Sequence, residues 1–173
     1  VSDAQRAQQL AMIEAQKKYK PNNWDRYDTN WKDATISDNA LMYNNNVTLS
    51  GGSDKINFFS SLTNMHQDGL IANDNYKRTN LTLNADAQLY SWLKIGVESA
   101  LRFSTLRNPG AGSPKAIINQ ALYMLPTLSA VHELDGNWGY GKNGLNPTAM
   151  AEDSGFSKTK THESVLGGTF TIT

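Results

Sequence analysis

Long stretches of alternating apolar and polar residues run through the middle of the chain. From Leu81 to Leu89, every second residue is apolar and its neighbours are polar. The alternation resumes at Leu93 and continues to Phe103, with Lys94 and other polar residues on the opposite side. Successive side chains of a β-strand point to opposite faces, whereas a helix would scatter this pattern around its circumference. The sequence therefore predicts strands.

The length of these stretches narrows the fold class. Strands of globular proteins average about five or six residues, and the alternation over residues 78–89 and 92–105 is about twice as long. Membrane-spanning strands need roughly 9–11 residues that alternate apolar outside and polar inside. Tyr90 and Trp92 also flank a tight connection, as amphipathic rings do at a membrane interface. This pattern favours a transmembrane β-barrel over a soluble sandwich with long strands.

Composition excludes several classes of protein. The 173 residues include 16 Lys or Arg and 16 Asp or Glu, so no net charge favours nucleic acid as a partner. The chain has no Cys, which excludes disulfides and thiolate metal sites. It has no apolar run of about 20 residues, so no transmembrane helix is expected, although a barrel is compatible with this. No signal peptide is recognised at Val1, and we expect a mature chain or one cut from something longer.

The fold predicted from these patterns is all-β. Antiparallel up-and-down strands form a fragment of a large transmembrane β-barrel, with a short N-terminal helix and one long loop. Short turns at Gly51-Gly52-Ser53 and at residues 90–92 alternate with longer connections, the asymmetry typical of periplasmic turns and extracellular loops. The predicted segments are a helix and irregular loop (1–43), a four-strand antiparallel meander (44–106), a long extracellular loop with a short helix (107–160), and the start of the next strand (161–173).

No catalytic motif is recognised. The three histidines are far apart and lack the spacing of zinc sites, and neither a phosphate-binding loop nor a nucleophile elbow occurs. We therefore expect no enzyme, no cofactor and no metal site. Within the long loop, residues 134–146 are rich in glycine, aromatic and amide side chains. Trp138 and Tyr140 are our candidates for stacking on a substrate, with Asn137 and Asn143 as amide donors.

A series of short motifs follows along the chain in a characteristic order. They are Trp31-Lys32-Asp33; Asn46, Ser50, Gly51, Gly52 and Lys55; Gln67 and Gly69; Tyr76 and Arg78; Asn84 and Asp86; Trp92 to Gly96; Leu125-Pro126-Thr127; Asp135-Gly136-Asn137; and Asn146-Pro147. This order and spacing resemble the SusC/RagA-like TonB-dependent outer-membrane transporters. One departure is Asp68, where that family often has Glu, a conservative change.

The resemblance implies a function as well as a fold. Such transporters are barrels of about 22 strands with an N-terminal plug and a segment that engages TonB. It implies a Gram-negative outer-membrane location, import of oligosaccharides or peptides, and contact with membrane lipid. The implied partners are a SusD-like surface lipoprotein and the TonB complex, reached through an N-terminal part missing from this chain, and no nucleic acid. With about five strands, the chain would be an early barrel fragment.

An alternative is a soluble carbohydrate-binding β-sandwich module. Trp24, Trp31, Trp138 and Tyr140 would then be platforms for stacking on sugar rings. The two hypotheses differ over the apolar face of strand 92–106. A sandwich buries this face against a second sheet, whereas a barrel exposes it to lipid.

Overall fold

The computed structural model describes residues 27–173, which divide into two compact units. The sheet unit comprises residues 40–69, 74–107 and 158–173, and the helical unit comprises residues 27–39, 70–73 and 108–157. The N-terminal helix expected from the sequence and Trp24 lie outside the described residues. None of the helices within 27–173 is long and apolar enough to cross a membrane.

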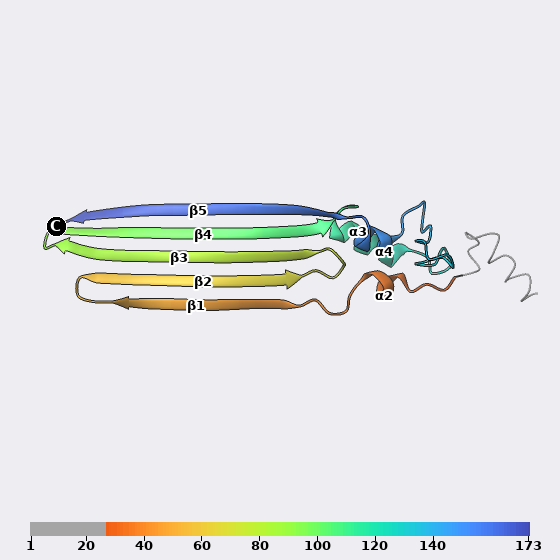
Figure 1. Cartoon of the computed structure of the whole chain (residues 1–173), viewed down its shortest axis with the longest axis horizontal. Coiled ribbons are helices and arrows are strands. Elements are labelled where there is room, and N and C mark those ends of the chain that lie inside the picture. Colours follow the sequence, from red (N-terminus) through yellow and green to blue (C-terminus); the bar gives the residue numbers. More distant parts are fainter. Residues whose placement is uncertain (1–26) are drawn as a thin grey trace, which may run out of the picture. The chain divides into compact units, whose positions relative to one another are not determined.

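The strands form one sheet in sequence order, so the predicted antiparallel up-and-down arrangement is confirmed (Figure 1). The strands are β1 (Met42–Gly52), β2 (Ile56–Asp68), β3 (Asn75–Tyr90), β4 (Leu93–Pro109) and β5 (Phe156–Ile172). They contain 11 to 17 residues each, enough to span a bilayer. The described residues contain this single sheet and no second one packed on it, which does not support the sandwich alternative.

The register of the sheet is continuous from β1 to β5. Val47 lies opposite Leu62, Leu62 opposite Leu81, and Leu81 opposite Leu101. Between β4 and β5, Arg102 Nη1 lies 3.0 Å from Glu163 Oε2, the Phe103 and His162 ring centroids are 5.3 Å apart, and Thr173 N donates to Trp92 O at 3.0 Å. All three pairs fit one antiparallel register, which places Lys160 opposite Thr105 and Leu166 opposite Ser99.

Two tight connections close the same end of the sheet. Between β1 and β2, Ser53 N donates to Ile56 O at 2.6 Å. Between β3 and β4, the ladder shifts register between Gln88 and Tyr90, and the Tyr90 and Trp92 rings stack with centroids 5.5 Å apart. The shift is a β-bulge, which re-aims side chains at the end of a strand.

Gly96 provides space at a crowded point of the sheet. A Cβ built on Gly96 would collide with the Thr169 hydroxyl of β5 and the Asp86 carboxylate of β3. Asp86 also lies 3.8 Å from the Lys94 ammonium. The glycine of the Trp92–Gly96 motif thus allows side chains of both neighbouring strands to approach the β4 backbone.

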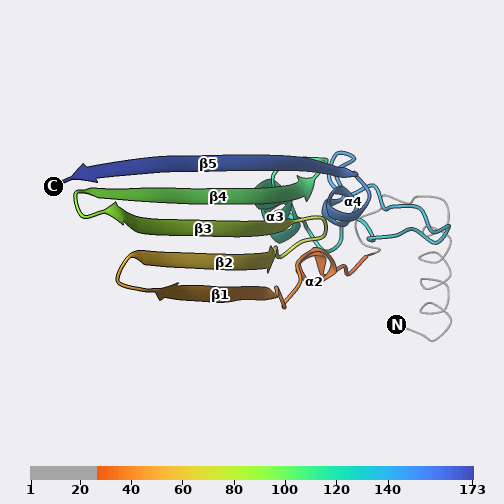
Figure 2. The same ribbon diagram turned by 60° about the vertical axis from the view of Figure 1, so that its left-hand side comes forward.

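The helical unit contains three short helices, α2 (Trp31–Thr35), α3 (Pro114–Tyr123) and α4 (Pro147–Glu152), which Figure 2 shows from a second direction. Ile71, Ile117 and Ala151 form a buried hydrophobic cluster in this unit. The hydroxyls of Thr35 and Thr148 lie 2.9 Å apart and join α2 to α4. Apolar burial, rather than helix propensity, stabilises helices this short.

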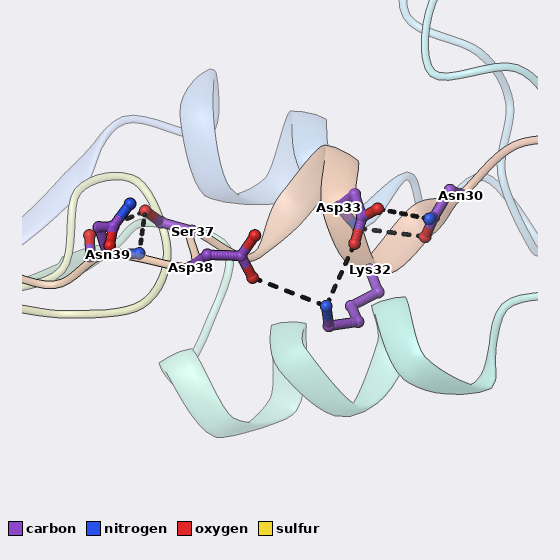
Figure 3. A network of polar contacts seen from close by, with 6 residues as sticks. All are labelled: Asn30, Lys32, Asp33, Ser37, Asp38 and Asn39. Atoms are coloured by element: carbon purple, nitrogen blue, oxygen red, sulfur yellow. Dashed lines mark hydrogen bonds and ion pairs between the residues drawn. The ribbon is translucent and has the colours of Figure 1, made fainter.

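A polar network fixes the start of α2 (Figure 3). The Asn30 side chain accepts from Asp33 N at 3.2 Å and donates to Asp33 Oδ2 at 2.6 Å. Lys32 Nζ lies 3.2 Å from Asp33 Oδ1 and 3.6 Å from Asp38 Oδ1, and the hydrogen bond and charge of Asp33 raise the pKa of Lys32. Trp31 is only 2% exposed. The Trp31-Lys32-Asp33 motif therefore has a structural role, and Trp31 cannot serve as the sugar platform of the sandwich alternative.

Element boundaries differ from the sequence prediction around the long loop. β4 continues to Pro109, β5 begins at Phe156 rather than at residue 161, and α4 was not predicted. The first residues of β5 are Phe, Ser, Lys, Thr and Lys. After Phe156, the residues on both faces of the strand are polar. This part of β5 therefore has no apolar–polar alternation from which a strand could be predicted.

Gly96→Val should destabilise the sheet, because the added side chain must displace Thr169 and Asp86. Overpacking of this kind costs about 1–3 kcal/mol. The measurement is the denaturant concentration at the midpoint of unfolding. Gly167→Val is the matched control, since a Cβ at Gly167 meets only Glu98 at 3.8 Å and beyond. Equal loss of stability in both variants would contradict this role for Gly96.

Candidate functional site

The sheet unit has two chemically different faces. We call the first the apolar face; the pairing in the ladders places on it Val47, Leu49, Ile56, Phe58, Leu62, Leu81, Leu83, Leu93, Ile95, Val97, Leu101, Phe103, Leu166, Phe170 and Ile172. Many of these side chains are well exposed, with Val47 at 69% and Phe170 at 79%. A contiguous exposed apolar surface of this kind marks a contact with protein or membrane.

The opposite face, which we call the polar face, carries charges of both signs. Its charged members in the five described strands are Arg78, Lys94 and Arg102, and Asp86, Glu98 and Glu163. Lys94 is close to Asp86, and Arg102 forms an ion pair with Glu163 at 3.0 Å. The charges of these three bases and three acids cancel, so the six residues give this face no net charge.

In the helical unit, residues 131–139 form a small hairpin. Gly139 N donates to Val131 O at 2.8 Å, and Glu133 N donates to Asn137 O at 2.8 Å. The turn uses Gly136 at φ 83°, where glycine carries no steric penalty. The Asp135 carboxylate accepts from the Asn137 backbone N at 3.0 Å and from its Nδ2 at 2.8 Å.

These two hydrogen bonds from Asn137 favour the ionised carboxylate and lower the pKa of Asp135. A carboxyl whose folded pKa is depressed stabilises the folded state above its unfolded pKa. This contribution to the hairpin is therefore present at neutral pH and is lost as the pH falls through the lowered value.

The structure brings Trp138 and Tyr140 together. Both line a shallow hollow of about 390 Å³, along with Asn146, Met150 and Asp153. The Trp138 ring stacks on His132 with centroids 4.1 Å apart, and its Nε1 donates to Asp153 Oδ2 at 3.0 Å. Tyr140 is 57% exposed. One ring is thus held in place by its neighbours, and the other is accessible.

The two asparagines among the predicted contact residues lie outside the lining of this hollow. The Asn137 side chain is engaged with Asp135. Asn143 adopts φ 57° and is followed by Gly144 at φ 81°, the Asn-Gly combination that favours a type I′ turn. The turn is closed by reciprocal backbone hydrogen bonds between Lys142 and Leu145 at 3.2 and 3.0 Å. Both asparagines therefore have a conformational role in addition to any contact with a ligand.

Asn146 organises the hollow, and we did not select it from the sequence as a site residue. It is 4% exposed, and its Nδ2 donates to Val131 O at 2.9 Å and to Gly139 O at 3.0 Å. Its Oδ1 accepts from the backbone N of Thr148 and Ala149 at 3.1 and 3.2 Å and so caps α4. An Asn directly before Pro147 is a helix-start signal that could have identified it.

Within residues 27–173, no group of three or more His, Asp or Glu side chains could hold a metal ion. His66 Nε2 lies 2.9 Å from Asp68 Oδ1, and the His66 ring stacks on Tyr43 with centroids 5.2 Å apart. This arrangement belongs to the strands and lies outside the hollow lined by Trp138.

Comparison with known proteins finds a curated relative. The chain is 26% identical over 135 residues to TonB-dependent receptor P3 of Formosa agariphila, an alignment that covers 73% of this chain and 13% of the receptor. No protein-family model matches the sequence.

Two solved structures share the fold. The RagAB peptide transporter matches with a TM-score of 0.64 at 20% identity, covering 89% of this chain and 18% of that chain. The RagAB peptide importer in its closed-closed state matches with a TM-score of 0.61 at 18% identity, covering 85% and 17%. These findings support the resemblance to the SusC/RagA-like transporters. The chain spans less than a fifth of the length of each of these relatives.

Proposed function

We propose that this chain forms part of the barrel wall and outer loops of a TonB-dependent importer in the outer membrane of Gram-negative bacteria. The observation that carries this proposal is the contrast between the faces of the sheet. The exposed side chains of the apolar face form a broad apolar band, and the polar face has balanced charges. A transmembrane barrel wall needs this combination, with lipid on one side and water on the other.

The height of the apolar band matches a bilayer. On β4 the band extends from Leu93 to Phe103. Ten steps of about 3.3 Å give about 33 Å along the strand, and a tilt of about 40° reduces this to a height of about 25 Å. Outer-membrane barrels have an apolar band of about this height between aromatic girdles. Tyr90 and Trp92 lie at one end of the band, and Phe103 and Tyr43 at the other.

The connections indicate an orientation. The short turns after β1 and β3 lie at the end with the Tyr90–Trp92 pair, whereas the connection between β4 and β5 contains α3 and α4. Short turns are periplasmic and long loops extracellular in such barrels. We assign the connection between β4 and β5 to the outside of the cell, where its residues can meet an imported molecule.

The proposed cargo is an oligosaccharide or a peptide. Trp138 and Tyr140 suit either, because an aromatic ring stacks on a sugar or on a planar peptide group, and RagAB, whose fold is similar, is described as a peptide transporter. Import would use a SusD-like lipoprotein at the outer surface and the TonB complex on the periplasmic side. The relatives are a receptor and transporters, and a role in transport rather than catalysis fits the described residues.

Val97→Arg should cost about 2–4 kcal/mol of barrel stability. Val97 lies in the middle of the band, so an arginine at this position would place a charge in the hydrocarbon. Ala100→Arg is the matched control on the polar face, and we expect it to cost far less. The measurement is folding of the full-length protein into lipid vesicles at increasing urea. Equal penalties would show that the faces are assigned incorrectly.

The orientation predicts which positions a membrane-impermeant thiol reagent reaches in intact cells. We expect Ala72→Cys, in the exposed connection between β2 and β3, to be labelled, and Ser53→Cys, in the β1–β2 turn, to be protected until the outer membrane is permeabilised. Ala72 is a better probe than Asn73, whose side chain donates to the carbonyls of Ala151 and Glu152. The opposite labelling pattern would reverse the orientation.

Tyr140→Ala should reduce uptake of the nutrient at least several-fold with the transporter at normal surface level, since it removes the accessible ring of the hollow. Leu134→Ala is the control, because Leu134 is 90% exposed in the same region and does not line the hollow. Growth of the producing strain on oligosaccharide and on oligopeptide, compared for both variants, identifies the class of cargo. Unchanged uptake of both nutrients in the Tyr140 variant would assign the hollow a purely architectural role.

A further inference from the structure

The apolar face changes character at one end. Asn64, Thr79, Phe103 and His162 form one row across this face. Below this row, towards the β1–β2 and β3–β4 turns, no residue of the five described strands on this face is charged. Above it, the charged residues of this face are Lys77, Arg107, Lys158 and Lys160, together with a single carboxylate, Asp68. The whole chain has a net charge of zero. A basic zone therefore lies directly beside the apolar band, and we call these four bases the basic rim.

The register concentrates the rim on three adjacent strands. Lys77 of β3 lies opposite Thr105 of β4, and Thr105 lies opposite Lys160 of β5. Because neighbouring strands are about 4.8 Å apart, Lys77 and Lys160 are separated by about 10 Å at the backbone. Lys158 lies two residues from Lys160 on the same face, about 7 Å away. The three ammonium groups can therefore converge on one ligand a few ångströms wide.

The nearby carboxylates do not neutralise these lysines. Asp68 interacts with His66 at 2.9 Å, and Glu163 points to the polar face, where it pairs with Arg102. No ion pair found within residues 27–173 includes Lys77, Lys158 or Lys160. All three are exposed. Their charge is thus directed outward, on the side of the sheet that carries the band.

We propose that the basic rim binds the phosphate groups of an anionic lipid in the outer leaflet, a phosphorylated glycolipid of the Gram-negative surface. This inference rests on the proposed function, which places the band in the hydrocarbon and the rim in the adjacent headgroup layer. Lysine stems can lie along apolar surface while their ammonium groups reach the headgroups. The rim follows the band across β3, β4 and β5, which suits a lipid layer at a constant depth.

The test uses the full-length transporter in detergent micelles with bisphosphorylated lipid A as the probe. We compare Lys77→Gln/Lys160→Gln with Lys55→Gln/Lys94→Gln, which removes the same charge from the opposite end of the sheet. About 1 kcal/mol per lysine near an anionic surface corresponds to about fivefold each. We therefore expect lipid A to bind on the order of 30-fold more weakly to the rim variant, with the control within about twofold. The Lys77→Arg/Lys160→Arg variant should retain binding.

Two further ligands, dephosphorylated lipid A and inorganic phosphate, distinguish binding of a lipid phosphate from binding of free phosphate. Dephosphorylated lipid A should bind the wild type and the rim variant equally weakly, and inorganic phosphate alone should not be retained. Equal affinity of the rim variant and the wild type for lipid A, or undiminished binding of dephosphorylated lipid A, would overturn the proposal. Retention of inorganic phosphate without lipid would also overturn it. So would a rim variant that loses pairing with the lipoprotein but still binds lipid A.

Outer-membrane insertion, measured by cell fractionation and heat-modifiable migration, distinguishes failure of this inference from failure of the proposed function. A wild-type protein that inserts but shows no rim-dependent lipid binding overturns the inference alone. Absence of the wild type from the outer membrane overturns both.

Discussion

The register of the antiparallel ladder is the constraint on which the rest of the sheet unit depends. Because side chains alternate between faces, a slip of one residue would move every side chain of a strand to the opposite face. It would place Lys94, Glu98 and Arg102 in the apolar band. The two tight connections, with the bulge between Gln88 and Tyr90, fix this register locally. Backbone pairing, rather than a packed core, thus separates the apolar side chains from the polar ones.

Much of the sheet could be predicted because its chemistry repeats with the period of the structure. Where one face is apolar, as from Leu93 to Phe103, alternation identifies both the strand and its facing. Where both faces are polar, as at the start of β5 from Ser157 to Lys160, the same backbone leaves no signal. That is why the boundary of β5 was wrong although its existence was foreseen. The helix α4 was missed because its six residues are too few to show a helical period.

The hollow of the helical unit shows a different limit of sequence reasoning. Trp138 and Tyr140 attract attention as aromatic residues in a polar loop, and the structure places both in one lining. Asn137 and Asn143 are polar residues of the same loop, but the structure uses both of them in turns. Asn137 donates to the nearby Asp135, and Asn143 adopts a left-handed backbone conformation, which Asn tolerates. Asn146 has the larger structural role because it joins three backbone segments that are separate in the sequence. The following Pro147 marks Asn146 in the sequence as the start of a helix, but only the tertiary structure shows the backbone segments that it joins.

The edges of the sheet connect this structure to the size of its relatives. β1 and β5 are its outer strands, and each has one row of backbone groups without a strand partner in the described part of the chain. Lipid cannot hydrogen-bond such groups, so a sheet in a bilayer is stable only when it closes. A sheet of five strands is too narrow to close around a water-filled lumen, and the relatives with this fold are more than five times longer than the matched region. The apolar band, the balanced polar face and the basic rim therefore acquire their proposed roles only when further strands pair with β1 and β5.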